Sequence, residues 1–145
     1  MNEQAWVARL QGWFPCSRGL GIGDDAAVFP DRDGLSRVVT TDLLVEGVHF
    51  LRQTHSLPLL ARKLLAVNLS DVAAMGATPT VAFLNLAGSL SDAEMTSFFE
   101  ALSGLCQNWG VELAGGDLSA SPILTLALTA EGQTPCPVLR TGARP

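Results

Sequence analysis

The segment from Leu64 to Met75 constrains the fold most, because it is apolar on nearly every side and carries one charged residue, Asp71. A helix with such a surface has to be covered on most of its circumference. Pro58 suits the first turn of a helix and Gly76 suits its end, so the pattern predicts a buried helix from Pro58 to about Met75. The chain has 145 residues, 48% of them apolar and 16% charged. That composition is enough to build one core around this helix.

Other patterns predict two further helices and a sheet. Apolar residues at helical spacing indicate a short helix over residues 3–14. Ser91, with Glu94 three residues later, forms a capping box that begins a helix ending near Trp109. Strand patterns occur over residues 26–29, 37–45, 80–86, 111–114 and 122–130. The mostly hairpin-like spacing predicts an α+β fold, with helices on one face of a mixed, mainly antiparallel sheet. The other face of that sheet needs a cover, such as a second subunit or domain.

Charge and cysteine content exclude several classes of function. The net charge is −5, and Lys63 is the only lysine, so the chain is electrostatically a poor nucleic-acid binder. Cys16, Cys106 and Cys136 are odd in number and far apart, which predicts neither a disulfide framework nor a zinc site. We therefore expect a reducing, cytoplasmic environment.

Neither a membrane span nor a secretory signal is expected. The chain has no apolar run of about eighteen residues, the length that a transmembrane helix requires. Residues 1–4 lack a basic segment followed by an apolar one.

Aspartates recur at the edges of the expected elements, in apolar or glycine-rich surroundings: Asp24-Asp25, Asp42, Asp71 and Asp117. Each has a structural explanation on its own. The first pair and Asp117 suit turns, Asp42 suits an exposed edge strand, and Asp71 suits a polar pair with Asn68 or a stripe facing solvent. Taken together they predict a cation site, because isolated carboxylates are costly to bury unless they are paired or bind a cation.

Oxygen ligands of this kind favour Mg²⁺. Thr40 lies on the same face of its strand as Asp42, which adds a hydroxyl to the carboxylates. Magnesium commonly shares its coordination with substrate phosphates, so it would let an acidic, lysine-poor domain bind a polyphosphate. The sequence has no GxxxxGK[ST] P-loop and no protein-kinase catalytic loop, and Gly19–Gly23 does not match GxGxxG. His49 follows the Asp42 strand; it is either structural or a donor to a substrate phosphate.

Four motifs resemble those of thiamine-monophosphate kinases in order and spacing. They are GIGDDAAV (21–28), TDLLVEGVHF (41–50), NLSDVAAMGATP (68–79) and GGD (115–117). The resemblance covers essentially the whole chain, and EGVHF is its most discriminating part. Relatives in the wider aminoimidazole-ribonucleotide-synthetase superfamily share the aspartate positions in looser form.

The resemblance implies a role for each matched residue. The implied Mg²⁺ ligands are Asp24, Asp25, Thr40, Thr41, Asp42, Asp71 and Asp117. His49 would contact the thiamine phosphate, and Gly116, Asp117 and Arg140 would bind ATP. The implied reaction transfers the γ-phosphoryl group of ATP to thiamine monophosphate, giving thiamine diphosphate and ADP. No side chain would form a covalent intermediate, because positioning and Mg²⁺ would supply the catalysis.

The resemblance also implies an organisation. Residues 1–132 would be an amino-terminal ATP- and Mg²⁺-binding domain, and residues 133–145 a linker toward a carboxy-terminal domain that this chain lacks. We expect the chain alone to be inactive. Two copies would pair sheet to sheet as a homodimer, with the nucleotide near the junction. The chain has no tyrosine; Phe98-Phe99 stand where relatives often place an aromatic hydroxyl, so contact with adenine there would be by packing.

Two alternatives stay open. The chain could belong to another ATP-using synthetase of the same superfamily, although residues 45–50 argue against this. It could also be a non-catalytic dimerisation or nucleotide-binding module, because half of the expected kinase is missing.

Overall fold

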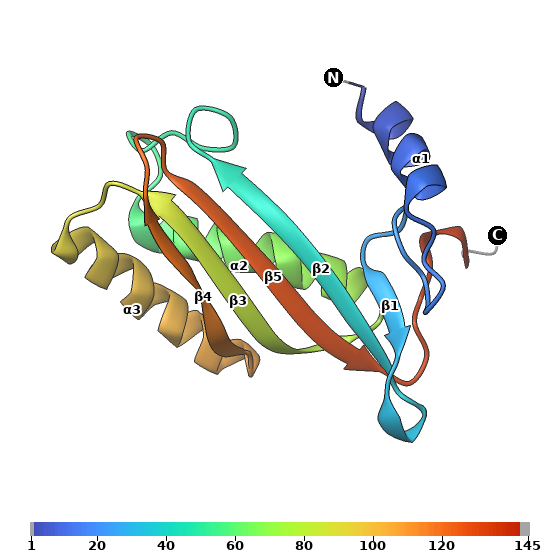
Figure 1. Cartoon of the computed structure of the whole chain (residues 1–145). Coiled ribbons are helices and arrows are strands. Elements are labelled where there is room, and N and C mark those ends of the chain that lie inside the picture. The colour runs from blue at the N-terminus through green and yellow to red at the C-terminus, as the bar shows by residue number, and fades with distance from the viewer. Residues whose placement is uncertain (1, 143–145) are drawn as a thin grey trace.

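The computed structural model describes residues 2–142 and forms one sheet with three helices (Figure 1). The helices are α1 (Glu3–Trp13), α2 (Leu57–Ala74) and α3 (Asp92–Trp109). The strands are β1 (Ala27–Pro30), β2 (Ser36–Val45), β3 (Thr78–Gly88), β4 (Glu112–Ala120) and β5 (Thr125–Thr134). Two short 3₁₀ turns cover Arg32–Gly34 and Arg140–Gly142.

The sheet has the strand order β1-β2-β5-β3-β4. Neighbouring strands are antiparallel except for β3 and β4, which run parallel and are joined through α3. Helices α2 and α3 lie on one face of the sheet, whereas α1 stands apart beside the β1 end (Figure 1). This confirms the predicted α+β class and leaves the other face of the sheet open.

The core lies between α2 and the centre of the sheet. Leu60, Leu64 and Val72 of α2 are fully buried. Leu126 and Leu128 of β5 are also fully buried, as the alternation along that strand predicts. The apolar α2 sequence therefore belongs to a helix that is covered by the sheet on one side and by α3 on another.

Local signals set the helix ends. Gly76 follows α2 with φ +67° and Gly110 follows α3 with φ +65°, both in the left-handed region that glycine adopts freely. Ser91 and Glu94 form the predicted capping box at the start of α3.

Strand ends differ from the prediction at β4 and β5. β4 continues through the glycines to Ala120 instead of stopping at Ala114, because a register shift beside Ala82 and Phe83 lets it stay paired with β3. β5 begins at Thr125 and runs to Thr134, so the first two residues of the predicted linker lie in the sheet. The division into two domains stays a prediction.

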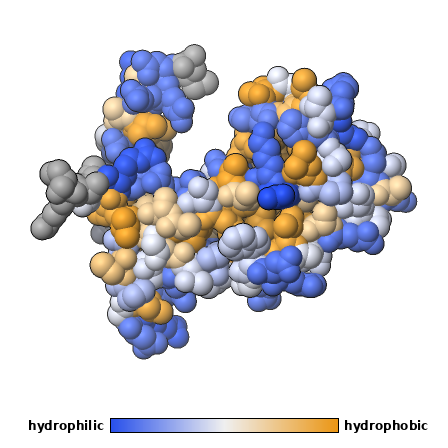
Figure 2. Space-filling model, turned by 180° about the vertical axis from the view of Figure 1, so that it is seen from behind, coloured by the Kyte–Doolittle hydropathy of each residue, from blue (hydrophilic) through white to orange (hydrophobic). Residues whose placement is uncertain are grey.

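On the helix side of the molecule, hydrophilic and hydrophobic residues are interspersed over the surface (Figure 2). In that view α1 is separated from the body of the domain by an open hollow. Within residues 2–142, no helix combines the length and the apolar character needed to cross a membrane.

Candidate functional site

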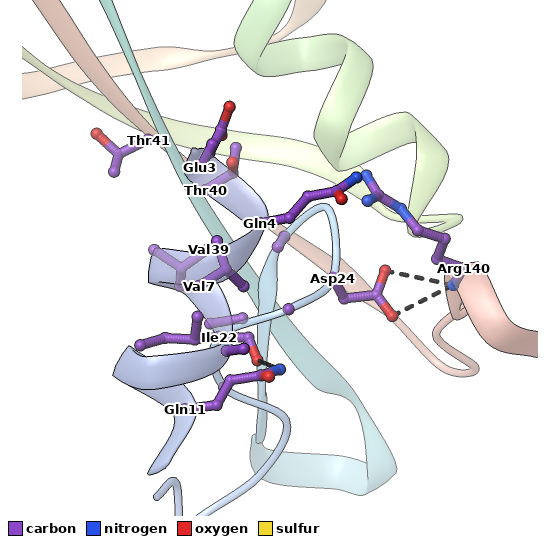
Figure 3. Close-up of a pocket in the computed structure, with 15 residues that line it drawn as sticks. Glu3, Gln4, Val7, Gln11, Ile22, Asp24, Val39, Thr40, Thr41 and Arg140 are labelled. Carbon is purple, nitrogen blue, oxygen red and sulfur yellow. Dashed lines mark hydrogen bonds between the residues drawn. The ribbon is translucent and has the colours of Figure 1, made fainter. Parts of the chain in front are cut away.

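A cleft of about 820 Å³ lies between α1, the 21–24 loop and β2 (Figure 3). Asp24, Thr40, Thr41 and Arg140 line it, all of them predicted site residues. α1 is tied to the loop by Gln11, whose Nε2 donates to the Ile22 carbonyl at 2.6 Å. The contribution of α1 to this cleft had no signal in the sequence, because its polar residues read as an ordinary exposed helix.

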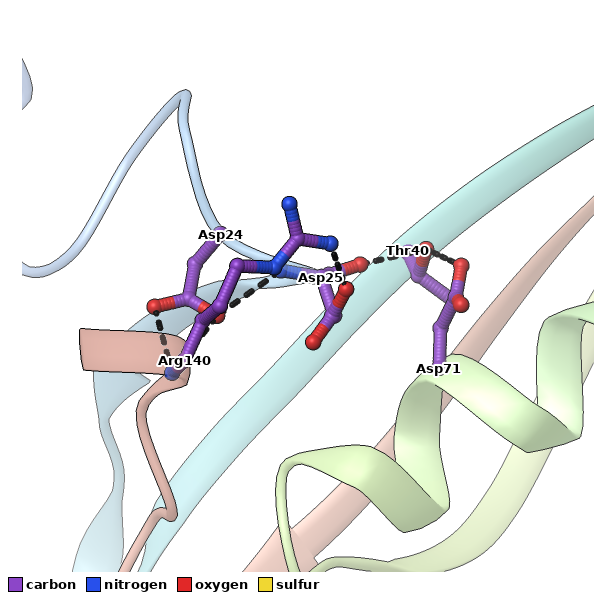
Figure 4. A network of polar contacts seen from close by, with 5 residues as sticks. All are labelled: Asp24, Asp25, Thr40, Asp71 and Arg140. Carbon is purple, nitrogen blue, oxygen red and sulfur yellow. Dashed lines mark hydrogen bonds and ion pairs between the residues drawn. The ribbon is translucent and has the colours of Figure 1, made fainter. Parts of the chain in front are cut away.

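Five predicted residues meet at one edge of the cleft (Figure 4). Thr40 Oγ1 lies 3.1 Å from Asp71 Oδ2 and 3.2 Å from the Asp25 carbonyl, so its single proton serves one acceptor at a time. The Arg140 guanidinium pairs with the Asp25 carboxylate. The backbone N–H of Arg140 donates to the Asp24 carboxylate at 3.2 and 3.3 Å. We call Asp24, Asp25, Thr40, Asp71 and Arg140 the acidic cluster.

Asp42 lies next to the acidic cluster on β2 and is held by α2. Its backbone N–H donates to Asn68 Oδ1 at 3.1 Å. Asn68 is fully buried, and its Nδ2 donates to the Leu64 carbonyl at 2.9 Å. Asn68 therefore fixes the position of β2 against α2 one turn before Asp71.

The outer edge of β2 explains why polar residues gather here. β1 pairs only with residues 36–39 of β2, which leaves the edge from Thr40 onward without a neighbouring strand. Side chains take over the exposed backbone donors: Asn68 accepts from Asp42, and His49 Nδ1 accepts from Val45 at 3.0 Å. An aspartate within an apolar strand is tolerated at such an edge.

The acidic cluster disfavours charge on Asp71. Burial raises the pKa of Asp71 above its ordinary value. The hydrogen bond from Thr40 opposes that rise, the negative charges of Asp42 and Asp25 add to it, and Arg140 opposes it. Asp71 thus lies close enough to two other carboxylates for their charges to act on it.

His49 follows a tight turn in which Gly47 has φ +81°. Besides accepting from Val45 through Nδ1, it accepts the Lys63 ammonium at its carbonyl oxygen, 2.5 Å away. The sequence singled out Lys63 only as the one lysine. Lys63 lies beside His49 because of the way α2 packs along β2. The helical spacing of residues in the sequence does not determine that packing.

Asp117 does not join the acidic cluster, contrary to the expected convergence of all four acidic positions. Strands β5 and β3 lie between β2 and β4, a separation of about 15 Å at the usual strand spacing. Asp117 pairs in register with Asn85 on the open face, whereas Thr40 and Asp42 point toward the helices. Its carboxylate accepts from Ser119 Oγ at 2.7 Å.

Thr41 also departs from the expected ligand set. Neighbouring residues of a strand point to opposite faces, so Thr41 lies on the opposite face of β2 from Thr40. Its hydroxyl donates to the Leu128 carbonyl at 3.2 Å.

Gly116 and Asp117 line a separate hollow of about 290 Å³ together with Phe99. Phe98 is fully buried, so of the two phenylalanines only Phe99 reaches the surface. Gly116 has φ +147°, and a Cβ there would lie 1.6 Å from the Leu84 carbonyl oxygen. The close approach of β4 to β3 therefore requires glycine at this position, whatever else it serves.

The donor set near the cleft fits Mg²⁺ in its chemistry. Among residues 2–142, no three His, Cys, Asp or Glu side chains converge tightly enough to hold a metal ion by themselves. Magnesium needs fewer protein ligands, because it keeps several waters and binds one or two carboxylates together with substrate phosphates. Asp25, Asp71 and the Thr40 hydroxyl offer the oxygen ligands that it prefers.

Comparison with known proteins gives consistent matches. Residues 23–134 match the family described as AIR synthase related protein, N-terminal domain. Thiamine-monophosphate kinase of Rhodopirellula baltica is 39% identical over 154 aligned positions, which cover 97% of this chain and 48% of that protein. The Escherichia coli K12 enzyme of the same name is 41% identical over 131 positions, covering 87% of this chain and 39% of that protein.

A solved structure, AaThiL complexed with AMPPCP and TMP, superposes with a TM-score of 0.88 at 30% identity. The match covers 98% of this chain and 45% of that one. The chain thus spans less than half the length of each of these relatives.

Proposed function

Because the chain belongs to the family of AIR synthase related proteins and matches their N-terminal domain, we propose that it binds ATP through Mg²⁺. We further propose that it forms the nucleotide-binding half of a kinase that phosphorylates thiamine monophosphate. The observation that carries this proposal is the acidic cluster with Asp42 beside it, at the edge of an open cleft. The relatives named thiamine-monophosphate kinase, and the related structure with AMPPCP and TMP, support the choice of substrates.

The proposed reaction needs positioning and charge neutralisation by this domain. A phosphate oxygen of thiamine monophosphate forms a bond to the γ-phosphorus of ATP, and the bond from that phosphorus to the β,γ-bridging oxygen breaks, so that ADP leaves. Bound Mg²⁺ neutralises charge on the phosphates. Asp25, Asp42, Asp71 and Thr40 are the residues we propose to hold it.

The remaining predicted residues have proposed roles around these phosphates. Arg140 contacts ATP, and its guanidinium already lies beside Asp25. His49 donates from Nε2 to the acceptor phosphate, because its Nδ1 is engaged as an acceptor. We retain Asp24, which lines the cleft, as a secondary metal ligand. We assign no metal to Thr41, because its hydroxyl donates to the Leu128 carbonyl on the opposite face of β2.

We propose a homodimer that pairs through the open face of the sheet. Leu43 and Phe83 are exposed large apolar residues on this face, and their burial would favour association. Asp117 lies on the same face, with Gly116 next to it. Any contribution of these two residues to nucleotide binding would therefore be made at the dimer junction. We propose a cytoplasmic location, where the free thiols of Cys16, Cys106 and Cys136 would persist.

One observation favours a second candidate for the chain itself, a nucleotide-binding or dimerisation module without activity of its own. The chain corresponds to 39% of the Escherichia coli relative and 48% of the Rhodopirellula one. Binding and turnover therefore have to be measured separately.

Calorimetric titration of the chain with AMPPCP, with Mg²⁺ or with EDTA, tests the proposal. We expect binding only with Mg²⁺, and we expect Asp71→Asn to weaken it at least tenfold. Asp33→Asn is the matched control, because Asp33 is in the turn between β1 and β2 and outside the acidic cluster. Binding that is equal in Mg²⁺ and EDTA would exclude the metal-bridged site. ADP formation with ATP and thiamine monophosphate then separates a kinase from a binding module.

A further inference from the structure

Three contacts join β2 and the segment after it to one flank of α2. Thr40 reaches Asp71 at 3.1 Å, and the Asp42 N–H reaches Asn68 at 3.1 Å. The third contact joins the His49 carbonyl to Lys63 at 2.5 Å. Residue numbers rise along β2 as they fall along α2, so the two elements run in opposite directions and the contacts form successive levels. We call this row of three contacts the α2–β2 seam.

The α2–β2 seam is acidic at one end and basic at the other. Asp25 and Asp71 mark the acidic end. Lys63 marks the basic end, eight residues before Asp71 and so about 12 Å from it along the helix axis. An elongated anion held at the acidic end through Mg²⁺ would extend toward a positive charge.

The positive charge of Lys63 is not paired with a negative charge among residues 2–142. Among residues 2–142 the ion pairs are Arg52 with Glu94 and Arg140 with Asp25, so no carboxylate lies within ion-pair distance of Lys63. Its half-buried side chain donates to a neutral carbonyl oxygen instead. A phosphate would be a stronger acceptor for the ammonium group than this carbonyl.

His49 adds a second donor at the basic end. Its Nδ1 accepts from the Val45 N–H at 3.0 Å, and a ring nitrogen that accepts carries no proton. A neutral His49 ring therefore carries its proton on Nε2, and no hydrogen bond among residues 2–142 uses that nitrogen. Lys63 and His49 together offer an ammonium and an imidazole N–H from adjoining positions.

We propose that Lys63 binds the phosphate of the acceptor substrate and makes this domain select a phosphate monoester over the corresponding free alcohol. The inference rests on the proposed function, which gives the acceptor as thiamine monophosphate. It adds a residue to that site and assigns it the discrimination between thiamine monophosphate and thiamine. Arg62, the neighbouring cation, is exposed and lines the groove between α2 and α3 instead.

The test compares thiamine monophosphate with thiamine as ligands, by calorimetry with Mg²⁺ and AMPPCP present. The wild-type chain should bind thiamine monophosphate roughly tenfold or more tightly, which is typical of a charge-assisted contact. Lys63→Met should bring the two affinities close together by weakening thiamine monophosphate alone. Lys63→Arg should restore part of the preference, and Arg62→Met should leave it intact. Added salt should reduce the wild-type preference.

Several outcomes overturn the inference. The inference fails if the wild-type chain does not bind thiamine monophosphate or binds both ligands with equal affinity. It also fails if the preference for thiamine monophosphate survives in Lys63→Met, or if that variant loses affinity for both ligands equally. The last result would mean that Lys63 only supports the fold. Lys63→Gln and a thermal melt of each variant guard against a variant that does not fold.

AMPPCP binding in the same samples separates the inference from the proposed function. If AMPPCP binds only with Mg²⁺ but the preference for thiamine monophosphate over thiamine does not depend on Lys63, the inference about Lys63 is wrong and the proposed nucleotide site is still supported. Absence of AMPPCP binding defeats the proposed function instead.

Discussion

Asp71 shows what the acidic cluster costs a chain that binds no cation. Its raised pKa means that the folded state favours the protonated carboxyl. The stability linked to this group is therefore full below its ordinary pKa of 3.8 and is lost as the pH rises through the folded-state pKa. At neutral pH the ionised Asp71 destabilises the fold relative to a neutral isostere.

We predict that Asp71→Asn melts a few degrees above the wild-type chain at pH 7 in EDTA. Asparagine keeps an acceptor for Thr40 and removes the charge that Asp42 and Asp25 repel. The difference should shrink as the pH falls toward 4, because the wild-type carboxyl then becomes protonated. Thermal melts across this pH range measure it.

Added Mg²⁺ provides the internal control for Asp71→Asn, because it should raise the melting temperature of the wild-type chain more than that of the variant. A variant that is less stable than the wild-type chain at pH 7 in EDTA contradicts this account of Asp71.

Gly116 carries a different residue-level prediction. Because a Cβ would lie 1.6 Å from the Leu84 carbonyl oxygen and φ is +147°, Gly116→Ala should lower the free energy of unfolding by more than about 1 kcal/mol. Gly115→Ala is the matched control: its Cβ would meet Phe83 at 3.5 Å, an ordinary contact. Urea unfolding of both variants measures the difference. Equal effects at the two positions would show that β4 can move away from β3.

The sequence located Asp25, Asp42 and Asp71 correctly near one another, and it failed for Asp117. The first three stand out because a carboxylate in apolar surroundings needs a partner. Asp117 was placed in a turn, since two glycines commonly end a strand. Pairing with β3 keeps those glycines in the strand. The face on which Asp117 lies depends on that register, which is set by a distant part of the chain.

At the level of elements, helices were easier to predict than strands because their ends have local chemical signals. α3 is the clearest case. Ser91 Oγ accepts from the Glu94 N–H, while the Glu94 carboxylate accepts from the Ser91 N–H at 2.8 Å. Both residues are visible in the sequence. The bounds of β5 had no such marker: the alternating pattern predicted a strand over residues 122–130, yet pairing with β2 and β3 carries it to Thr134.

We predict that Ser91→Ala lowers the free energy of unfolding by about 1 kcal/mol, the usual effect of losing an N-cap side chain. Ser103→Ala, on the exposed side of the same helix, should change it little, because alanine is favoured within helices. Chemical denaturation gives both values. AMPPCP binding should stay intact in Ser91→Ala, because α3 supplies no residue to the acidic cluster. A loss of nucleotide binding in that variant would mean that α3 also shapes the nucleotide site.

At the scale of the whole molecule, the sheet has helices on one face and exposed apolar residues on the other. Phe83 is 38% exposed and Leu43 is 49% exposed, both on the open face. Patches of this kind usually mark an interface. The register places Thr41 and Thr129 in the same row as Phe83, so the face combines apolar side chains with hydroxyl groups.

We therefore predict that the chain sediments as a dimer and that Phe83→Glu shifts it to monomer. The introduced charges would be buried against each other across the two-fold junction. Trp109→Glu, a change of an exposed aromatic residue at the end of α3, should leave the dimer intact, because that position lies on the helix side. Sedimentation velocity over a range of concentrations distinguishes these states. A wild-type chain that stays monomeric at high concentration, or a dimer broken by Trp109→Glu and not by Phe83→Glu, would place the interface elsewhere. In that case Asp117 would face solvent rather than a nucleotide at the junction.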